Sequence, residues 1–402
     1  MSDASSDIRL RLGVRPVINL TGTLTSLGGI RVIPEAAQAA VEMMDYGVDM
    51  VELQAQASRI IARVTGAEAG FVAGCTSAGI CMTIAGAMTG DDLARIERLP
   101  DTKGMKDEVV IQHGHVVDYG HSIGQDIRLT GARMVTVGHV NSARPHQLSE
   151  ALGERTAAAL YVVSHHTVQF GQIPFPTFVG LCRERGVPVI VDLAAEYDLR
   201  GYHAQGADAT IHSGQKFLGG PTSGVVSGTK SLMRAAFLQN FGIGRPMKLG
   251  KEGVAGLLAA LEAWEQRDHA GERAVALEVL TAWQRRFSQY PGISAAIDPD
   301  PTRNPFDRLK VTVDPRRAGL TAWELVHRLE QGQPPIVMRT HQLEFGYFIM
   351  DLRSLRPGEQ EVVAQRVCEE LEAAREGRAP TLASPQERRL RQAEALRRWP
   401  GY

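Results

Sequence analysis

Residues 207–224 read ADATIHSGQKFLGGPTSG, and this stretch decides which fold the chain is expected to adopt. A strand is expected to end at Ile211, a hydroxyl follows at Ser213, and Lys216 comes three residues later, before a glycine-rich turn leads into the next apolar run. A lysine beside two glycines is weak evidence when taken alone, because most lysines are solvated. Two segments earlier in the chain indicate a functional role for Lys216.

The first of these segments is VPVIVDLAA, which begins at Val187 and places Asp192 after a run apolar enough for a central buried strand. Open α/β sheets bind their ligands at the carboxyl ends of the strands. The 24 residues from Asp192 to Lys216 have room for one helix and one strand, so both side chains are expected above the same sheet edge. Asp192 is therefore a candidate partner for the pyridinium nitrogen of pyridoxal 5′-phosphate (PLP), and the alternative is a helix N-cap.

The second segment, GFVAGCTSAG at residues 70–79, is typical of a strand, a small-residue turn and a helix start. Such a turn exposes backbone N–H groups at the positive end of a helix dipole, where a phosphate binds well. Thr76, Ser77 and Ser213 are the candidate hydroxyl donors. Neither a Walker A motif nor Gly-x-Gly-x-x-Gly occurs in this region, which argues against an ordinary nucleotide site. A simple N-cap is the alternative.

The rest of the chain is typical of an α/β fold with a mostly parallel sheet. About seven strands are predicted, at 70–72, 109–112, 134–137, 159–163, 187–191, 208–211 and 224–227. A smaller α+β domain is predicted to follow, with strands at 309–313, 335–339 and 347–350 and helices at 321–330 and 359–376. The predicted organisation is an N-terminal arm (1–25), a large PLP-binding domain (26–250), a bridging helix (251–290), a small C-terminal domain (291–380) and an Arg-rich tail (381–402).

Composition limits the kinds of molecule that the protein is expected to bind. The chain has 402 residues, 44% of them hydrophobic, and a formal net charge of −1, so no basic field for nucleic acid or anionic lipid is expected. No signal peptide and no membrane-spanning run is found, which predicts a cytoplasmic protein. The four cysteines have no metal-ligand or disulfide spacing. A small-molecule amino substrate is therefore the expected partner, and no metal site is predicted.

The motif HSGQKFLGGP at 212–221 resembles the cofactor-lysine motif of bacterial selenocysteine synthase, the seryl-tRNA selenium transferase, and of relatives such as D-glucosaminate-6-phosphate ammonia-lyase. Further matches are PVINLTG at 16–22, VVI at 109–111 with Gly114 and Gly120, PPIVMR at 334–339 and MDLRSL at 350–355. The resemblance covers about residues 10–375. It implies a PLP-dependent type I fold and a homodimer or larger homo-oligomer with shared active sites.

The resemblance also implies a role for individual residues. Lys216 matches the Schiff-base lysine and Asp192 the pyridinium partner. Ser213 and the turn at 75–78, with Cys75, Thr76 and Ser77, match the phosphate contacts. His113 matches the position that stacks on the cofactor ring, with His115 as the alternative. Arg339 matches the arginine that binds the substrate carboxylate, since its planar guanidinium can donate two parallel hydrogen bonds. The alternative for Arg339 is a surface salt bridge. Thr21 and His166 are candidate pocket residues.

Two differences separate this chain from selenocysteine synthase. That enzyme carries an N-terminal helical domain used on tRNA, whereas here the matching segment begins at Val17. The run at 50–56 and the stretch at 118–120 resemble the ammonia-lyase-like branch more closely.

The expected reaction is abstraction of an α-proton by Lys216 and β-elimination from a small amino acid or amino-sugar acid, giving a 2-oxo acid and ammonia. An aminotransferase, racemase or aldolase acting on a similar substrate and a non-catalytic PLP-binding regulatory module remain alternatives.

Overall fold

The computed structural model describes residues 7–377 and the single positions 390, 394, 397 and 400. It divides into two compact units. Unit 1 comprises Met1–Leu27, His269–Pro299 and Phe306–Tyr402, and unit 2 comprises Gly28–Asp268 and Asp300–Pro305. Residues 251–290 form two helices, α11 (Lys251–Gln266) in unit 2 and α12 (His269–Phe287) in unit 1. The Arg-rich tail predicted at 381–402 lies outside the described residues apart from the single positions.

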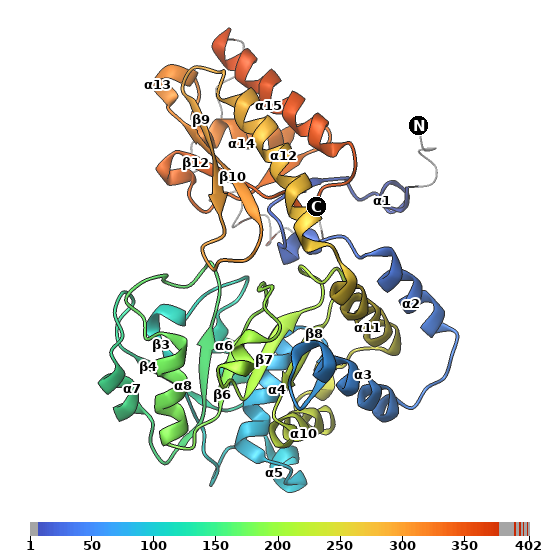
Figure 1. Cartoon of the computed structure of the whole chain (residues 1–402), viewed down its shortest axis with the longest axis vertical. Coiled ribbons are helices and arrows are strands. Elements are labelled where there is room, and N and C mark those ends of the chain that lie inside the picture. The colour runs from blue at the N-terminus through green and yellow to red at the C-terminus, as the bar shows by residue number, and fades with distance from the viewer. Residues whose placement is uncertain (1–6, 378–389, 391–393, 395–396, 398–399, 401–402) are drawn as a thin grey trace. The chain divides into compact units, whose positions relative to one another are not determined.

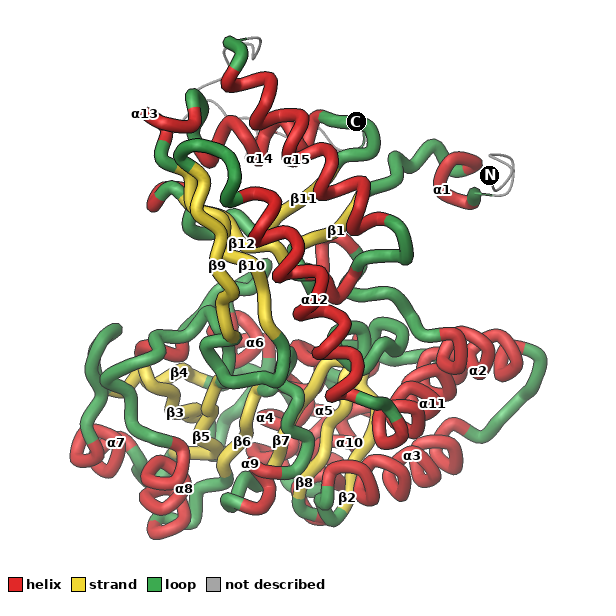
Figure 2. Tube along the Cα trace, turned by 45° about the horizontal axis from the view of Figure 1, so that its top comes forward, coloured by secondary structure: helices red, strands yellow, loops and turns green. Residues whose placement is uncertain are grey.

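The strands of unit 2 are β2 (Ala69–Ala73), β3 (Glu108–Gln112), β4 (Arg133–Val137), β5 (Thr156–Val162), β6 (Val189–Asp192), β7 (Ala209–Ser213) and β8 (Gly224–Gly228). Within the described chain they form one seven-stranded sheet in the order β2-β8-β7-β6-β5-β3-β4 (Figure 1 and Figure 2). Among these strands β8 runs in the direction opposite to that of the other six. The predicted fold class, an α/β protein with a mostly parallel sheet, is confirmed.

Helices cover both faces of this sheet (Figure 2). The helices of unit 2 before α11 are α2 (Pro34–Met44), α3 (Met50–Thr65), α4 (Thr76–Thr89), α5 (Leu93–Arg98), α6 (Ile123–Leu129), α7 (Pro145–Ala151), α8 (Phe175–Glu184), α9 (Gly201–Ala204) and α10 (Lys230–Leu238). Successive strand residues point to opposite faces. Val109 and Ile111 therefore pack in the core under α4, α6 and α10, whereas Val110 packs in the core under α7 and α8.

β2 lies at the edge of the sheet, and at one position a side chain forms the hydrogen bonds that a neighbouring strand would form. The amide of Gln54, on α3, donates to the carbonyl oxygen of Val72 and accepts from the N–H of Val72, both at 2.9 Å. Gln54 thus replaces one peptide of a neighbouring strand. Because an unpaired buried peptide is costly, this buried glutamine stabilises the edge next to the turn that follows β2.

Unit 1 contains α1 (Ile8–Arg11), β1 (Ile18–Leu20), β9 (Ile293–Pro299), β10 (Asp307–Val313), α13 (Pro315–Ala318), α14 (Ala322–Gln331), β11 (Ile336–Met338), β12 (Tyr347–Met350) and α15 (Glu359–Arg375), in addition to α12. β12, β10 and β9 form an antiparallel sheet, and β1 pairs in parallel with β11. The strands β1 and β9 were not predicted. No helix in the described parts of the chain has the length and apolar character needed to cross a membrane.

Candidate active site

Two parallel strands of unit 2 end next to each other where the site is predicted. Asp192 closes β6 and pairs with Ile211 of β7, which continues to Ser213. Ser213 pairs with Gly224 at the start of β8, and Gly224 pairs on its other side with Ala73 at the end of β2. The predicted carboxylate, the predicted hydroxyl and the small-residue turn after β2 therefore meet at one edge of the sheet.

The turn after β2 starts helix α4 with Cys75 as its N-cap. The Cys75 Sγ accepts a hydrogen bond from the N–H of Ala78 at 3.4 Å. Thr76 and Ser77 open the helix, and N–H groups in a first helical turn have no partner within the helix. A Cβ on Gly224 would lie 2.5 Å from the Cys75 carbonyl oxygen, so glycine is needed for this close approach. The helix start has the dipole and donors that suit a phosphate.

The hydroxyl of Ser77 has a partner inside the protein. Its Oγ donates to Oδ1 of Asp126, on α6, at 2.5 Å. A hydroxyl has one proton to donate, so Ser77 cannot give the same proton to a phosphate. The Ser77 hydroxyl is therefore not available for the phosphate contact predicted for it, and only its backbone N–H is left as a candidate. Ser213 is buried at the end of β7.

Lys216 lies in a turn that glycines and two buried apolar residues hold in place. The N–H of Gly214 donates to the carbonyl oxygen of Ser223 at 2.9 Å, and Gly219 has a φ of 75°, which favours glycine. Phe217 and Leu218 are fully buried directly after the lysine. The half-buried Lys216 therefore stands on a turn anchored at both ends.

Asp192 is the buried carboxylate of this edge, with 5% of its surface exposed. Its Oδ1 accepts the N–H of Ala194 at 3.1 Å. Burial raises the pKa of Asp192 to about 6, and the positive charge of Lys216 acts against this shift. The amine and the carboxylate thus lie close enough to interact electrostatically.

The two histidines considered for ring stacking have different environments. Both follow β3, in the short helix His113–His115. His115 is buried: its Nδ1 accepts the N–H of Val162 at 3.1 Å and its ring packs edge-on against Tyr161, and burial lowers its pKa to about 4. His113 is exposed. His113 is therefore the one of the two whose ring is accessible to a ligand.

His166 follows β5, another strand that ends at this edge. Its backbone N–H donates to the Ser164 Oγ at 3.2 Å, and its ring lies 3.8 Å from that of His165. The side chain is exposed. Among the described residues, no group of three or more His, Cys, Asp or Glu side chains is arranged to hold a metal ion.

Thr21 and Arg339 lie in unit 1, around a third residue that was not predicted as functional. Thr21 forms a β-bridge with Asp351, and Arg339 forms one with Ile349. Asp351 is fully buried and holds Arg353 through Nε–Oδ1 and Nη2–Oδ2 hydrogen bonds of 3.0 and 2.7 Å. Burial would raise the pKa of Asp351, but the charges of Arg353 and Arg339 keep it below its usual value. Asp351 lies in the motif at 350–355, so a signal for it was present.

Unit 2 has the functional groups that PLP requires. An amine suited to the cofactor aldehyde, a buried carboxylate suited to the ring nitrogen and a helix start suited to the phosphate gather at one sheet edge. Burial raises the pKa of this carboxylate, and a cationic ring nitrogen beside it would stabilise the charged form. The residues present therefore fit the cofactor.

Comparison with known proteins gave consistent results. The model of the family described as SelA, L-seryl-tRNA selenium transferase, matches residues 17–290. A D-glucosaminate-6-phosphate ammonia lyase from Salmonella typhimurium is 39% identical over 368 residues, which are 92% of this chain and 99% of the relative. A 5′-C-glycyluridine monooxygenase-decarboxylase from a Streptomyces species is 38% identical over 372 residues, 92% of this chain and 93% of the relative. A solved structure of D-glucosaminate-6-phosphate ammonia-lyase superposes with a TM-score of 0.85 at 39% identity, covering 93% of this chain and all of the other.

Proposed function

The chain belongs to the L-seryl-tRNA selenium transferase family, and from this membership we propose that it is a PLP-dependent ammonia-lyase acting on a small amino acid or amino-sugar acid. The observation that carries the proposal is the buried Asp192 at the end of β6, with the charge of Lys216 acting on it. The identity to the ammonia lyase over nearly the whole chain supports the reaction type.

The cofactor, when bound, supplies an electron sink that stabilises negative charge at the substrate α-carbon. The buried Asp192 would hold a proton at the ring nitrogen and so keep the sink cationic. The Lys216 amine takes the α-proton, and the same group then delivers a proton to the leaving β-substituent. Loss of that substituent and hydrolysis give a 2-oxo acid and ammonia.

The other predicted residues are assigned by chemistry. The backbone N–H groups of Thr76 and Ser77 and the hydroxyl of Ser213 hold the cofactor phosphate. The ring of His113 would stack on the cofactor, and Arg339 would bind the substrate carboxylate. Thr21 and His166 are the further candidates for contact with the substrate. The assignments in unit 2 are supported by the position of each group at the carboxyl ends of the strands and by its match to the motifs of the family. The assignments of Arg339 and Thr21, which lie in unit 1, are supported by the match to these motifs.

A second candidate function comes from the relative named as a monooxygenase-decarboxylase, whose identity to this chain is almost the same. That reaction would consume oxygen and release carbon dioxide, whereas β-elimination releases ammonia without oxygen. The two reactions are thus separable by their products.

The test is a product assay with purified full-length protein and added PLP. D-glucosaminate 6-phosphate and a panel of β-hydroxy amino acids serve as probes, and ammonia, 2-oxo acid, carbon dioxide and oxygen uptake are measured together, with Lys216→Ala as the control. We expect equal amounts of ammonia and 2-oxo acid under anaerobic conditions. Oxygen-dependent release of carbon dioxide would favour the second candidate, and inversion or amino transfer without ammonia would reject the lyase.

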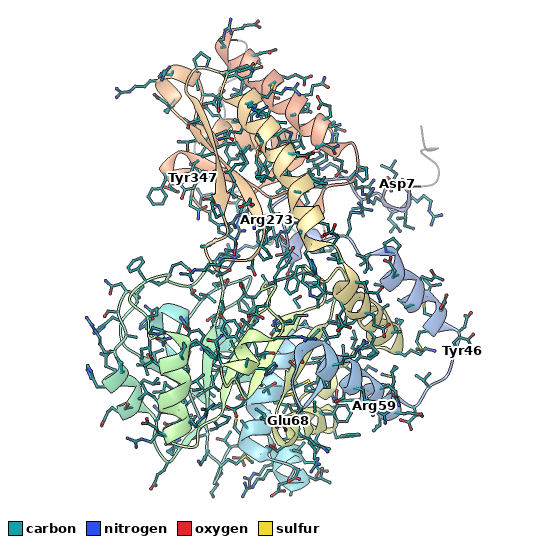
Figure 3. The ribbon with its side chains drawn as sticks, in the orientation of Figure 1. Asp7, Tyr46, Arg59, Glu68, Arg273 and Tyr347 are labelled. Atoms are coloured by element: carbon teal, nitrogen blue, oxygen red, sulfur yellow. The ribbon has the colours of Figure 1, made fainter. Side chains whose placement is uncertain are left out.

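We also propose that the protein is a homodimer. Large apolar side chains are exposed at the end of α2 (Val41 and Met44), at the start of α3 (Val51) and in the connection between them, where Tyr46 lies at the outer edge of unit 2 (Figure 3). Adjacent exposed apolar residues are typical of an interface between proteins. Sedimentation velocity of the wild type and of Tyr46→Glu tests the proposal, since the substitution should shift the protein towards monomer. The cytoplasmic location stays a prediction from the sequence.

A further inference from the structure

Unit 2 contains a second buried carboxylate, and the roles assigned so far do not use it. Asp126, on α6, is fully buried, and its carboxyl group accepts from two hydroxyl groups and lies close to a histidine ring. Its Oδ1 accepts from the Ser77 Oγ at 2.5 Å and lies 3.3 Å from Nε2 of His121, and its Oδ2 accepts from the hydroxyl of Tyr119. The thiol of Cys81 donates to the backbone carbonyl oxygen of Asp126 at 3.3 Å. These contacts join α4, α6 and the loop at 118–122.

The hydrogen bonds suit the ionised form of Asp126. Burial raises the pKa of Asp126 above its ordinary value, and the hydrogen bonds from Ser77 and Tyr119 act against this shift. Burial and the charge of Asp126 raise the pKa of Tyr119 above its usual value, so this phenol keeps its proton and remains a donor. Hydrogen bonds accepted on both oxygens of a carboxyl group stabilise its ionised form.

The cluster lies next to the cofactor edge of the sheet. Ser77 belongs to the first turn of α4, which packs across β5, β6 and β7, and Asp192 is the last residue of β6. The two carboxylates influence each other: the charge of Asp126 contributes to the raised pKa of Asp192, and the charge of Asp192 contributes to that of Tyr119.

We propose that Asp126 is a positioning residue that acts through Asp192: its buried negative charge strengthens the hold of Asp192 on the proton of the cofactor ring nitrogen. Its hydrogen bond to Ser77 at the same time fixes the first turn of α4, where the phosphate is expected. The inference rests on the proposed PLP site. It assigns a role to a residue that touches neither substrate nor cofactor.

The other charged groups near Asp192 leave this role to Asp126. Lys216 is positive and opposes it. Glu196 also lies within range, but burial raises its pKa to about 8, so that carboxyl is mostly protonated at pH 7 and adds little negative charge. Asp126 accepts hydrogen bonds on both carboxyl oxygens, an arrangement that suits a carboxylate, and we therefore assign the additional negative charge near Asp192 to it.

The experiment follows the ring nitrogen itself. Full-length wild type, Asp126→Asn and Asp208→Asn are loaded with PLP that is isotope-labelled at the ring nitrogen, and the nitrogen resonance is recorded by NMR across pH. Asp208 is the control, because it is a half-buried carboxylate whose pKa is also raised by burial. It precedes β7 at the opposite end from Ser213, where it accepts the N–H of Val189 at 2.8 Å. Both variants lose one partly or fully buried negative charge.

We expect the pH at which the ring nitrogen loses its proton to fall by about 0.5 to 1 unit in Asp126→Asn, less than a charge in direct contact would cause. It should stay unchanged in Asp208→Asn. Tyr119→Phe, which removes one donor and leaves Asp126 less ionised, should give a smaller fall in the same direction and replaces Asp126→Asn if that variant does not fold. Equal midpoints in wild type, Asp126→Asn and Tyr119→Phe, or an equal fall in the control, would overturn the inference.

The experiment distinguishes a wrong role for Asp126 from a wrong proposal of PLP-dependent function. If wild type does not bind PLP at Lys216, the proposed function itself fails. If it does bind and the ring nitrogen of Asp126→Asn titrates as in wild type, only the role of Asp126 is lost.

Discussion

Replacement of Asp192 by asparagine should stabilise the cofactor-free protein while weakening its hold on PLP. Burial raises the pKa of Asp192 to about 6 from its ordinary 3.8. An acid whose pKa is raised by folding stabilises the fold fully below its unfolded pKa, and that stabilisation is lost as the pH rises through the folded pKa. The difference of about two pKa units corresponds to roughly 3 kcal/mol at pH 8. Asparagine does not ionise, keeps an acceptor for the Ala194 N–H and avoids this cost.

The dependence on pH makes the prediction specific. At pH 5 folded wild type has lost only part of the stability that depends on a protonated Asp192. The free energy of unfolding of Asp192→Asn should therefore exceed that of wild type by about 1.5 kcal/mol at pH 5 and by about 3 kcal/mol at pH 8. Urea unfolding of both cofactor-free proteins, followed by circular dichroism at one protein concentration, measures the two values. Equilibrium dialysis should show the opposite order for PLP, with the variant binding more weakly. A stability difference that is the same at both pH values, or a variant less stable at pH 8, would refute the reasoning.

Three further predictions concern single residues. Lys216→Ala should lose the visible absorption of the lysine-bound cofactor, and borohydride reduction followed by mass spectrometry should find no attached cofactor; attachment at the usual yield would mean that another amine is used. His115→Gln keeps an acceptor for the Val162 N–H but does not titrate. Burial lowers the pKa of His115 to about 4 from 6.5, so the stability that neutral His115 contributes is present above pH 6.5 and is lost as the pH falls through 4. Over this window the free energy of unfolding of wild type should fall by up to about 3 kcal/mol more than that of the variant. Identical pH slopes of the two proteins in urea titrations would contradict this. Gln54→Ala leaves both backbone groups of Val72 without their side-chain partner and should lower the free energy of unfolding by roughly 2–4 kcal/mol, measured by urea denaturation at pH 7, whereas a loss below about 1 kcal/mol would show that another group replaces the amide.

The large sheet was predictable because local sequence determines its strands. Each of its strands lies on a short apolar run, and β6 and β7 end at Asp192 and Ser213, within two residues of the predicted ends. In unit 1 the pattern failed for β1 and β9. The three residues of β1 are too few to show a period, and their partner β11 is far away in the sequence.

The candidate site was predictable only where a motif or a strand end marked the residue. Lys216, Asp192 and the turn at 75–78 stand at such positions. Asp126 does not: it lies within a short helix, and its partner Ser77 is 49 residues away. The role of a buried hydrogen-bond acceptor depends on groups brought together by packing, so residue spacing alone gave no sign of it. The same packing used the Ser77 hydroxyl, which the motif assigns to phosphate.

The pairing of β1 with β11 sets the order in which the two units can be completed during synthesis. β1 leaves the ribosome early, but Ile336, which pairs with Ile18, follows about 300 residues later. The long continuous part of unit 2, Gly28–Asp268, is made in between. Because domains fold as units while the chain emerges, the large sheet assembles first and the N-terminal strand waits without its partner. A nascent chain halted before β11 therefore presents β1 to proteases, and release of the full chain closes that period of exposure.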